Sequence, residues 1–318
     1  MTKRCAQSGG SRRTRHSLGL PIAPTHQGRL PLSPEVPLQP EPIIAAVFAL
    51  VWGSLWGSFL NVVVYRLPAG LSVVRPRSRC PQCLTPIASW HNIPVLSWLL
   101  LRGRCAACQA PIAVRYPAVE STVAALSLAV ATPWLPLCLA SEPVGWQPVL
   151  ALLGEQLFVF VWVAIALIDA DTFVVPDVLS LPLPLLGLAL AALVGDLRGV
   201  TWQQSGAGAL VGGGGLLLVQ WLYGRLTGRE GLGTGDIKLL GGIGALLGLV
   251  ALPAVVLAAA VQGLLFAAAF AVLQRGKALQ DRGLQSIRHL ALPFGPFLVL
   301  AAVQWLLLHR WLAPLLGG

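Results

Sequence analysis

The sequence predicts an all-α protein that crosses a membrane about eight times and carries one small polar insert. The first observation behind this prediction is composition: 56% of the 318 residues are hydrophobic and only 11% are charged, whereas ordinary soluble proteins contain about 25% charged residues. The second is the mean hydropathy of +0.75. A soluble core does not explain this excess of apolar residues, but a bundle of membrane-spanning helices does.

The basic residues lie mostly between the apolar runs rather than on one soluble surface. The net charge of +10 therefore does not indicate nucleic acid as a partner, and the expected surroundings are a lipid bilayer. Residues 1–41 contain six Lys/Arg among many Pro, Gly and Ser and are predicted to form a disordered tail. No apolar core precedes residue 43, so the tail does not look like a cleaved signal peptide; a wrongly assigned start codon is the alternative explanation.

The first predicted span is Ile43–Tyr65, and the first transmembrane helix as a whole is assigned to residues 42–65. At 1.5 Å per residue it is long enough to cross about 30 Å of hydrocarbon. It ends in Gly57–Asn61, whose small residues favour close helix packing. Asn61 is expected either to bridge helices or to line a site at the membrane edge.

Residues 66–117 are predicted to form a hydrophilic insert, with seven Arg and two Cys-x-x-Cys pairs separated by 21 residues. This spacing is typical of a structural zinc site that uses four thiolates, here Cys80, Cys83, Cys105 and Cys108. A disulfide-bonded loop is one alternative, but the basic charge favours the reducing cytoplasmic side. A zinc ribbon that binds nucleic acid is a weaker alternative.

The rest of the chain, 118–318, is predicted to contain seven further spans. They are expected at Ala118–Ala140, Val149–Ile168, Val178–Val194, Ala207–Tyr223, Leu239–Val250, Pro253–Leu273 and 292–308. Fourteen of the 22 Lys/Arg lie in the loops 66–117, 224–238 and 274–291, which the positive-inside rule therefore assigns to the cytoplasmic side. The basic tail falls on the other side and departs from the rule. Glu155, inside the third span, is expected to have a capping, interfacial or helix-facing role.

Two aspartates beside long apolar runs, Asp169 and Asp236, are the candidate catalytic residues. A carboxylate at membrane depth is costly and usually functional, and the charge count places both on the cytoplasmic side. Asp171 would face another direction on a continuing helix, and Asp177 is expected to be an N-cap. A helix cap or a headgroup contact is the alternative for Asp236.

If Asp169 and Asp236 meet, the pair can share one proton: one carboxylate activates water and the other, protonated, stabilises the carbonyl under attack. Gly233, Gly235 and Lys238 are the candidate residues of a loop that meets the substrate. The two glycines would permit close approach and unusual backbone angles there; a flexible turn before a helix is the alternative for them. Two other classes remain open at this point. The same pair could act as the proton relay of a proton-coupled transporter, or the chain could be a scaffold built on the cysteine insert.

Several motifs in the same order resemble one family. They are Gly57–Asn61, the paired Cys-x-x-Cys insert, the run Asp169–Asp177, and Gly233–Asp236 followed by Ile237 and Lys238. Over residues 43–310 the chain resembles the type IV prepilin peptidases, bifunctional leader peptidases and N-methyltransferases that serve type IV pili and type II secretion.

The resemblance implies a multi-pass GxGD aspartic protease of the bacterial inner membrane with its catalytic face in the cytoplasm. It places the catalytic residues at Asp169 and Asp236, because the family's first aspartate stands seven residues before the Pro of a Pro-Asp pair, here Pro176. The implied substrates are prepilins and pseudopilins with a short basic leader, and the implied methyl donor is S-adenosylmethionine. The insert resembles the family's zinc-binding domain, and Asn61, Arg66 and Glu120 are candidate residues for methyl transfer.

Overall fold

The structure, a computed structural model, describes residues 40–140, 145–228, 233–278 and 292–312. Within these ranges the regular structure is helical, and the only β-type pairing consists of two isolated bridges in the insert. The predicted tail, 1–41, lies outside the described residues except for its last two positions.

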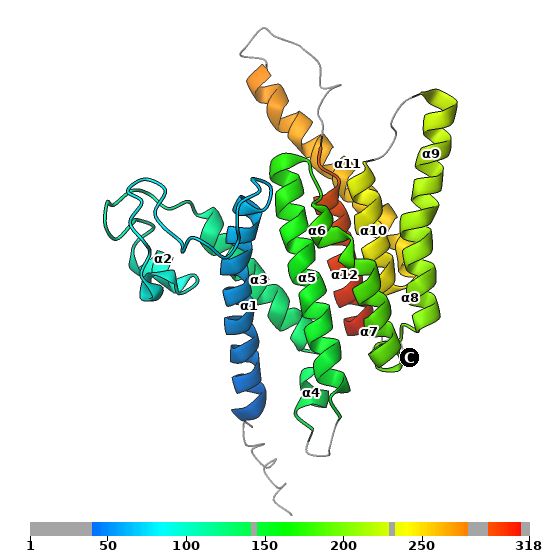
Figure 1. Cartoon of the computed structure of the whole chain (residues 1–318), viewed down its shortest axis with the longest axis horizontal. Helices are drawn as coiled ribbons and strands as arrows, with labels where there is room; N and C mark the ends of the chain where they lie inside the picture. The colour runs from blue at the N-terminus through cyan, green and yellow to red at the C-terminus, as the bar shows by residue number, and fades with distance from the viewer. Residues whose placement is uncertain (1–39, 141–144, 229–232, 279–291, 313–318) are drawn as a thin grey trace, which may run out of the picture. The chain divides into compact units, whose positions relative to one another are not determined.

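Helix α5 (Gln147–Thr172) is the central element of the bundle. It packs against α1 (Pro40–Arg66), α3 (Arg115–Ala131), α7 (Pro182–Arg198) and α12 (Gly295–Leu312) (Figure 1). Because it has neighbours on several sides, its large apolar side chains, such as Phe158, Trp162 and Ile165, are fully buried. A helix that is apolar all round is expected in this position.

The C-terminal half supplies the helices on the other side of α5. They are α6 (Asp177–Ser180), α7 (Pro182–Arg198), α8 (Trp202–Ala209), the π-helical turn η2 (Leu210–Gly215), α9 (Leu216–Thr227), α10 (Thr234–Leu247), α11 (Ala251–Ala278) and α12 (Gly295–Leu312). Helix α10 is the most enclosed, and every residue from Leu239 to Leu247 is buried. Glycine makes this packing possible, because a Cβ added at Gly208 would lie only 2.1 Å from the carbonyl oxygen of Gly244.

Five helical segments are long and apolar enough to cross a membrane. They are Glu41–Arg66, Gln147–Thr172, Asp177–Arg198, Trp202–Thr227 and Ala251–Val272. The protein is therefore a multi-pass membrane protein by length and composition. Helices also occur at the other three predicted spans, but α3 has 17 residues, α10 has 14 and the apolar helix Gly295–Arg310 is shorter than the five, so the number eight stays a prediction.

Two predicted span boundaries are wrong. The second span was expected to run from Ala118 to Ala140, but α3 ends at Ala131 and a separate short helix, α4 (Leu135–Cys138), follows. Pro133 lies in this break, and proline cannot donate the backbone hydrogen bond that a continuing helix needs.

The break between the sixth and seventh spans also differs from the prediction. The predicted spans separate between Val250 and Pro253, whereas α10 ends at Leu247, before Gly248 with its φ of +82°, and α11 begins at Ala251. Pro253 occupies the first turn of α11, where the missing N–H costs nothing because it would have no helical partner.

A buried ionic network joins α5, α7 and α12 at the end of the bundle away from Asp169. Glu155 is fully buried and accepts hydrogen bonds from Arg198 Nε at 2.9 Å, from Trp134 Nε1 at 2.9 Å and from Arg310. The Arg310 guanidinium also lies 4.2 Å from the centre of the Trp134 ring. The helix-facing role expected for Glu155 is confirmed, with two cationic partners that the sequence did not indicate.

Candidate active site and metal centre

The three carboxylates that follow the apolar run of α5 have different surroundings. Asp169 is buried, with only 5% of its surface exposed. Asp171 is exposed and forms a two-pronged ion pair with Arg115, at 3.0 and 2.6 Å. The helix continues through both residues to Thr172, so the two side chains face different directions, as expected. Of the three, Asp169 is the one held inside the bundle.

The third carboxylate of this run, Asp177, is not the N-cap that the sequence predicted. Helix α6 begins at Asp177 itself, and the cap position belongs to Pro176, without a side-chain cap. The Asp177 carboxylate instead accepts a hydrogen bond from Lys238 Nζ at 2.6 Å. This ion pair connects α6 to the first turns of α10.

Asp236 lies in the first turn of α10 and is half-buried. The end of α5 that carries Asp169 and the start of α10 lie toward the same end of the bundle (Figure 1). Gly235, next to Asp236, packs on Val175, which follows Asp169 by six residues. We call this end of the bundle, with Asp169 and Asp236, the aspartate end.

Gly295 is a third component of the aspartate end, and it was not among the residues predicted from the sequence. It is the first residue of α12, and its backbone N–H donates a hydrogen bond to Asp169 Oδ2 at 3.0 Å. An added Cβ at this position would lie 2.6 Å from the same oxygen. The available signal was Gly295 followed directly by Pro296 before an apolar run, a pattern typical of a helix start.

The two glycines before Asp236 differ in their surroundings, and neither has a positive φ. Gly233 is extended, with φ −65° and ψ 130°. Gly235 packs on the segment between α5 and α6, because an added Cβ would lie 2.8 Å from Val175 Cβ. The expectation of unusual angles is therefore wrong, and the absence of a side chain at Gly235 is what lets α10 lie against Val175.

The four cysteine sulfurs of the insert form one cluster. The Sγ atoms of Cys80, Cys83, Cys105 and Cys108 all lie within 4.8 Å of one another, and those of Cys80 and Cys108 are 3.8 Å apart. A tetrahedral ion with metal–sulfur bonds of about 2.3 Å would separate its ligands by about 3.8 Å. The cluster therefore fits a metal ion, and the five cysteines in the described residues are free thiols.

The two halves of the cluster have the same backbone structure. In the first half, the Cys80 N–H donates to the Thr85 carbonyl, and Leu84 adopts a positive φ. In the second half, the Cys105 N–H donates to the Ala110 carbonyl, and Gln109 adopts a positive φ. Hydrogen bonding with Thr85 also lowers the pKa of the Cys83 thiol to about 6. Each half thus turns two sulfurs toward the shared centre.

The three candidate residues for methyl transfer hold the insert and α3 against α1. Asn61 Nδ2 donates to the Tyr116 carbonyl at 3.3 Å, and Arg66 donates to the carbonyls of Ser72 and Pro76 at 3.0 and 2.9 Å. Glu120 is buried and accepts from the backbone N–H of Val95 at 2.7 Å. All three side chains thus have hydrogen-bond partners within the protein, at the place where α1, α3 and the insert meet.

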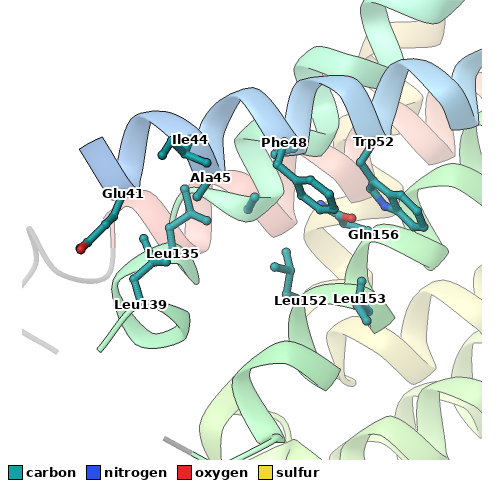
Figure 2. Close-up of a pocket in the computed structure, with 12 residues that line it drawn as sticks. Glu41, Ile44, Ala45, Phe48, Trp52, Leu135, Leu139, Leu152, Leu153 and Gln156 are labelled. Carbon is teal, nitrogen blue, oxygen red and sulfur yellow. The ribbon is translucent and has the colours of Figure 1, made fainter. Parts of the chain in front are cut away.

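A cavity of about 410 Å³ lies near the start of α1 (Figure 2). Residues from α1, α4 and α5 line it, and most of them are apolar. Gln156 on its wall precedes Asp169 by 13 residues of the same helix, a separation of about 20 Å. This cavity is therefore not part of the aspartate end.

Two carboxylates at one end of an apolar helical bundle are the arrangement that an intramembrane aspartic peptidase needs. The chain belongs to the type IV leader peptidase family. The model of that family matches residues 156–268, and the model of the bacterial peptidase A24 N-terminal domain matches residues 51–134.

Relatives named prepilin leader peptidase/N-methyltransferase match the chain over most of its length. A prepilin leader peptidase/N-methyltransferase of Aeromonas hydrophila is 38% identical over 285 residues, which cover 82% of this chain and 87% of that protein. Proteins of the same name from Stutzerimonas stutzeri and Neisseria gonorrhoeae are 35% and 34% identical and cover 84% and 83% of the chain. No solved structure matches the chain.

Proposed function

We propose that the chain removes the leader peptide from prepilins and pseudopilins by aspartic proteolysis and then N-methylates the new N-terminal residue. The peptidase activity is supported by the different surroundings of three neighbouring carboxylates, Asp169, Asp171 and Asp177. Asp171 and Asp177 form ion pairs with Arg115 and Lys238. Asp169 has no such cationic partner among the described residues; it is buried beside a backbone donor, at the same end of the bundle as Asp236.

In this proposal Asp169 and Asp236 share one proton. The ionised carboxylate accepts a proton from water as the oxygen attacks the scissile carbonyl, and the protonated carboxyl donates a hydrogen bond to the carbonyl oxygen. The tetrahedral intermediate then collapses as its nitrogen receives a proton and leaves as the amine of the mature pilin. Both carboxylates return to their starting state, and no covalent enzyme intermediate forms.

The substrate's apolar helix would lie in the bilayer beside the bundle, with its leader on the cytoplasmic side of the inner membrane. An extended scissile segment would then approach α10 at Gly233 and Gly235, where side chains are absent. The methyl donor would be S-adenosylmethionine, and we propose the junction of α1, α3 and the insert, around Asn61, Arg66 and Glu120, as the region for methyl transfer. The four cysteines would hold a structural Zn²⁺ that fixes this insert.

The test is cleavage of a purified prepilin by the full chain in proteoliposomes, with Asp169→Asn, Asp236→Asn and Asp171→Asn compared. We expect the first two variants to lose roughly a hundredfold or more in rate, as is typical when a general acid or base is removed. Asp171→Asn is the matched control, because it changes a carboxylate two residues away that is exposed and ion-paired. Normal cleavage by Asp169→Asn or Asp236→Asn would refute the proposed pair.

A further inference from the structure

The insert between α1 and α3 has an unusual surface. Residues 66–117 contain seven Arg and no Asp, Glu or Lys. Large apolar side chains are nevertheless exposed on it, with Trp90 70% and Leu100 81% exposed. We call the following set the apolar face of the insert: Trp90, Ile93, Leu96, Leu99 and Leu100. Exposed apolar surface of this kind marks a site of interaction.

The short helix α2 (Leu96–Leu100) turns its leucines outward and its polar residue inward. Ser97 is its one buried residue. The Ser97 hydroxyl donates to the Trp90 carbonyl and accepts from the N–H of Ile93, both at 3.0 Å. This pattern is the reverse of a helix on a water-soluble domain, whose apolar side faces the core, and it is expected where the surrounding medium is apolar.

Contacts with α1 and α3 fix the depth at which α2 begins. Val95, directly before α2, donates its N–H to Glu120 on α3. Glu120 in turn packs on Gly57 of α1, where an added Cβ would lie 2.7 Å from Glu120 Cα. Val95, Glu120 and Gly57 are therefore at similar levels along α1.

This level lies within the membrane. The span Glu41–Arg66 has 26 residues and is about 39 Å long. Placed upright and centred on a hydrocarbon core of about 30 Å, it extends beyond the core by only 4–5 Å at each end. Gly57 precedes Arg66 by nine residues, a distance of about 13 Å along the axis. Helix α2 thus begins below the edge of the hydrocarbon, on the side of α1 away from α5 (Figure 1).

The arginines of the insert complement this position. Arg102 and Arg104 directly follow α2 and are exposed, as are Arg75, Arg77 and Arg79. Arginine next to an apolar segment can extend its guanidinium to the lipid phosphates while its methylene groups stay in the apolar region. Tryptophan at the level of the headgroups is also typical of proteins at a membrane interface.

We propose that the apolar face of the insert enters the leaflet at the Arg66 end of α1, and that the adjacent arginines bind the phosphates of anionic phospholipids. The partner is the bilayer itself. The insert is then a membrane-embedded element instead of a domain surrounded by water, and its cysteine cluster is held at the membrane surface. The proposal does not depend on the catalytic roles of Asp169 and Asp236.

The experiment places a photoreactive benzoylphenylalanine at Leu100 in the full chain, reconstituted in nanodiscs of phosphatidylethanolamine and phosphatidylglycerol. The matched control carries the same residue at Gln82, which is exposed on the first cysteine pair. After irradiation, mass spectrometry identifies the adducts. We expect several-fold more lipid adducts at Leu100 than at Gln82, with zinc content unchanged in both variants.

A second comparison tests the charge. Nanodiscs of phosphatidylcholine alone should give fewer lipid adducts at Leu100 than those with phosphatidylglycerol, and Arg102→Gln with Arg104→Gln should remove that difference. Equal lipid labelling at Leu100 and Gln82 would overturn the proposal. So would adducts at Leu100 that join two copies of the chain or that capture an added prepilin in place of lipid.

Discussion

The backbone N–H of Gly295 donates a hydrogen bond to Asp169 Oδ2 at 3.0 Å, although the two residues are 126 positions apart. This bond joins the start of α12 to the end of α5 at the aspartate end. Glu155 and Arg310 join the same two helices at the other end of the bundle. Asp169 is therefore held by a helix that is itself fixed at both ends.

A methyl group at Gly295 should displace Asp169. In Gly295→Ala the new Cβ would lie 2.6 Å from Oδ2, and we expect prepilin cleavage to fall by roughly tenfold to a hundredfold, as is typical when a catalytic group moves by about 1 Å. Gly263→Ala is the control, since its Cβ would meet Phe297 at an ordinary 3.5 Å. Cleavage rates that are equal in the two variants would show that Gly295 does not position Asp169.

The buried ionic network should dominate the stability of the bundle. Glu155→Gln leaves two arginines without a counter-charge inside the protein, and such a change costs about 3 kcal/mol or more. The exposed pair of Asp171 and Arg115, whose side chains are 39% and 46% exposed, should contribute less than about 1 kcal/mol. Thermal unfolding in detergent should therefore show a large drop in Tm for Glu155→Gln and a small one for Asp171→Asn; similar drops would contradict the assignment.

Gly235 should tolerate no side chain. In Gly235→Ala the added Cβ would lie 2.8 and 2.9 Å from two carbons of Val175, so α10 and the segment before α6 must separate, and Asp236 moves with α10. We expect at least a tenfold loss of cleavage at unchanged expression, on the same physical ground of misplacement. Gly214→Ala has nothing within 4 Å of its Cβ and should retain activity. If both variants cleave normally, the packing on Val175 does not set the position of Asp236.

The metal content should depend on the four clustered cysteines alone. Cys80→Ser removes one ligand of the proposed zinc site, so elemental analysis should find zinc lost from this variant and limited proteolysis should cut the insert faster. Cys138→Ser changes a free thiol outside the cluster and should keep its zinc. Retention of zinc in Cys80→Ser, or its absence from the unmodified chain, would refute the zinc site.

The sequence by itself determined the class of protein and the composition of its parts. Hydropathy and charge can be evaluated from short segments of the chain. They predicted a bundle of membrane-spanning helices, and they placed Asp169 and Asp236 at the same end of that bundle. The spacing of the two Cys-x-x-Cys pairs likewise predicted a cluster that the structure shows. Two helix ends, before Pro133 and at Gly248, were nevertheless misplaced, because apolar residues continue on both sides of each break and hide the single proline or glycine that causes it.

Only the tertiary structure decided which groups meet. Asp171 and Asp177 acquire cationic partners from α3 and α10, Asp169 acquires the N–H of Gly295, and Glu155 acquires two arginines. The exposure of the leucines of α2 can be interpreted only because the bond from Val95 to Glu120 fixes where α2 begins along α1 and α3. Each of these relationships joins residues at least 25 positions apart, and no periodicity or short motif encodes a contact that exists only after the helices have packed.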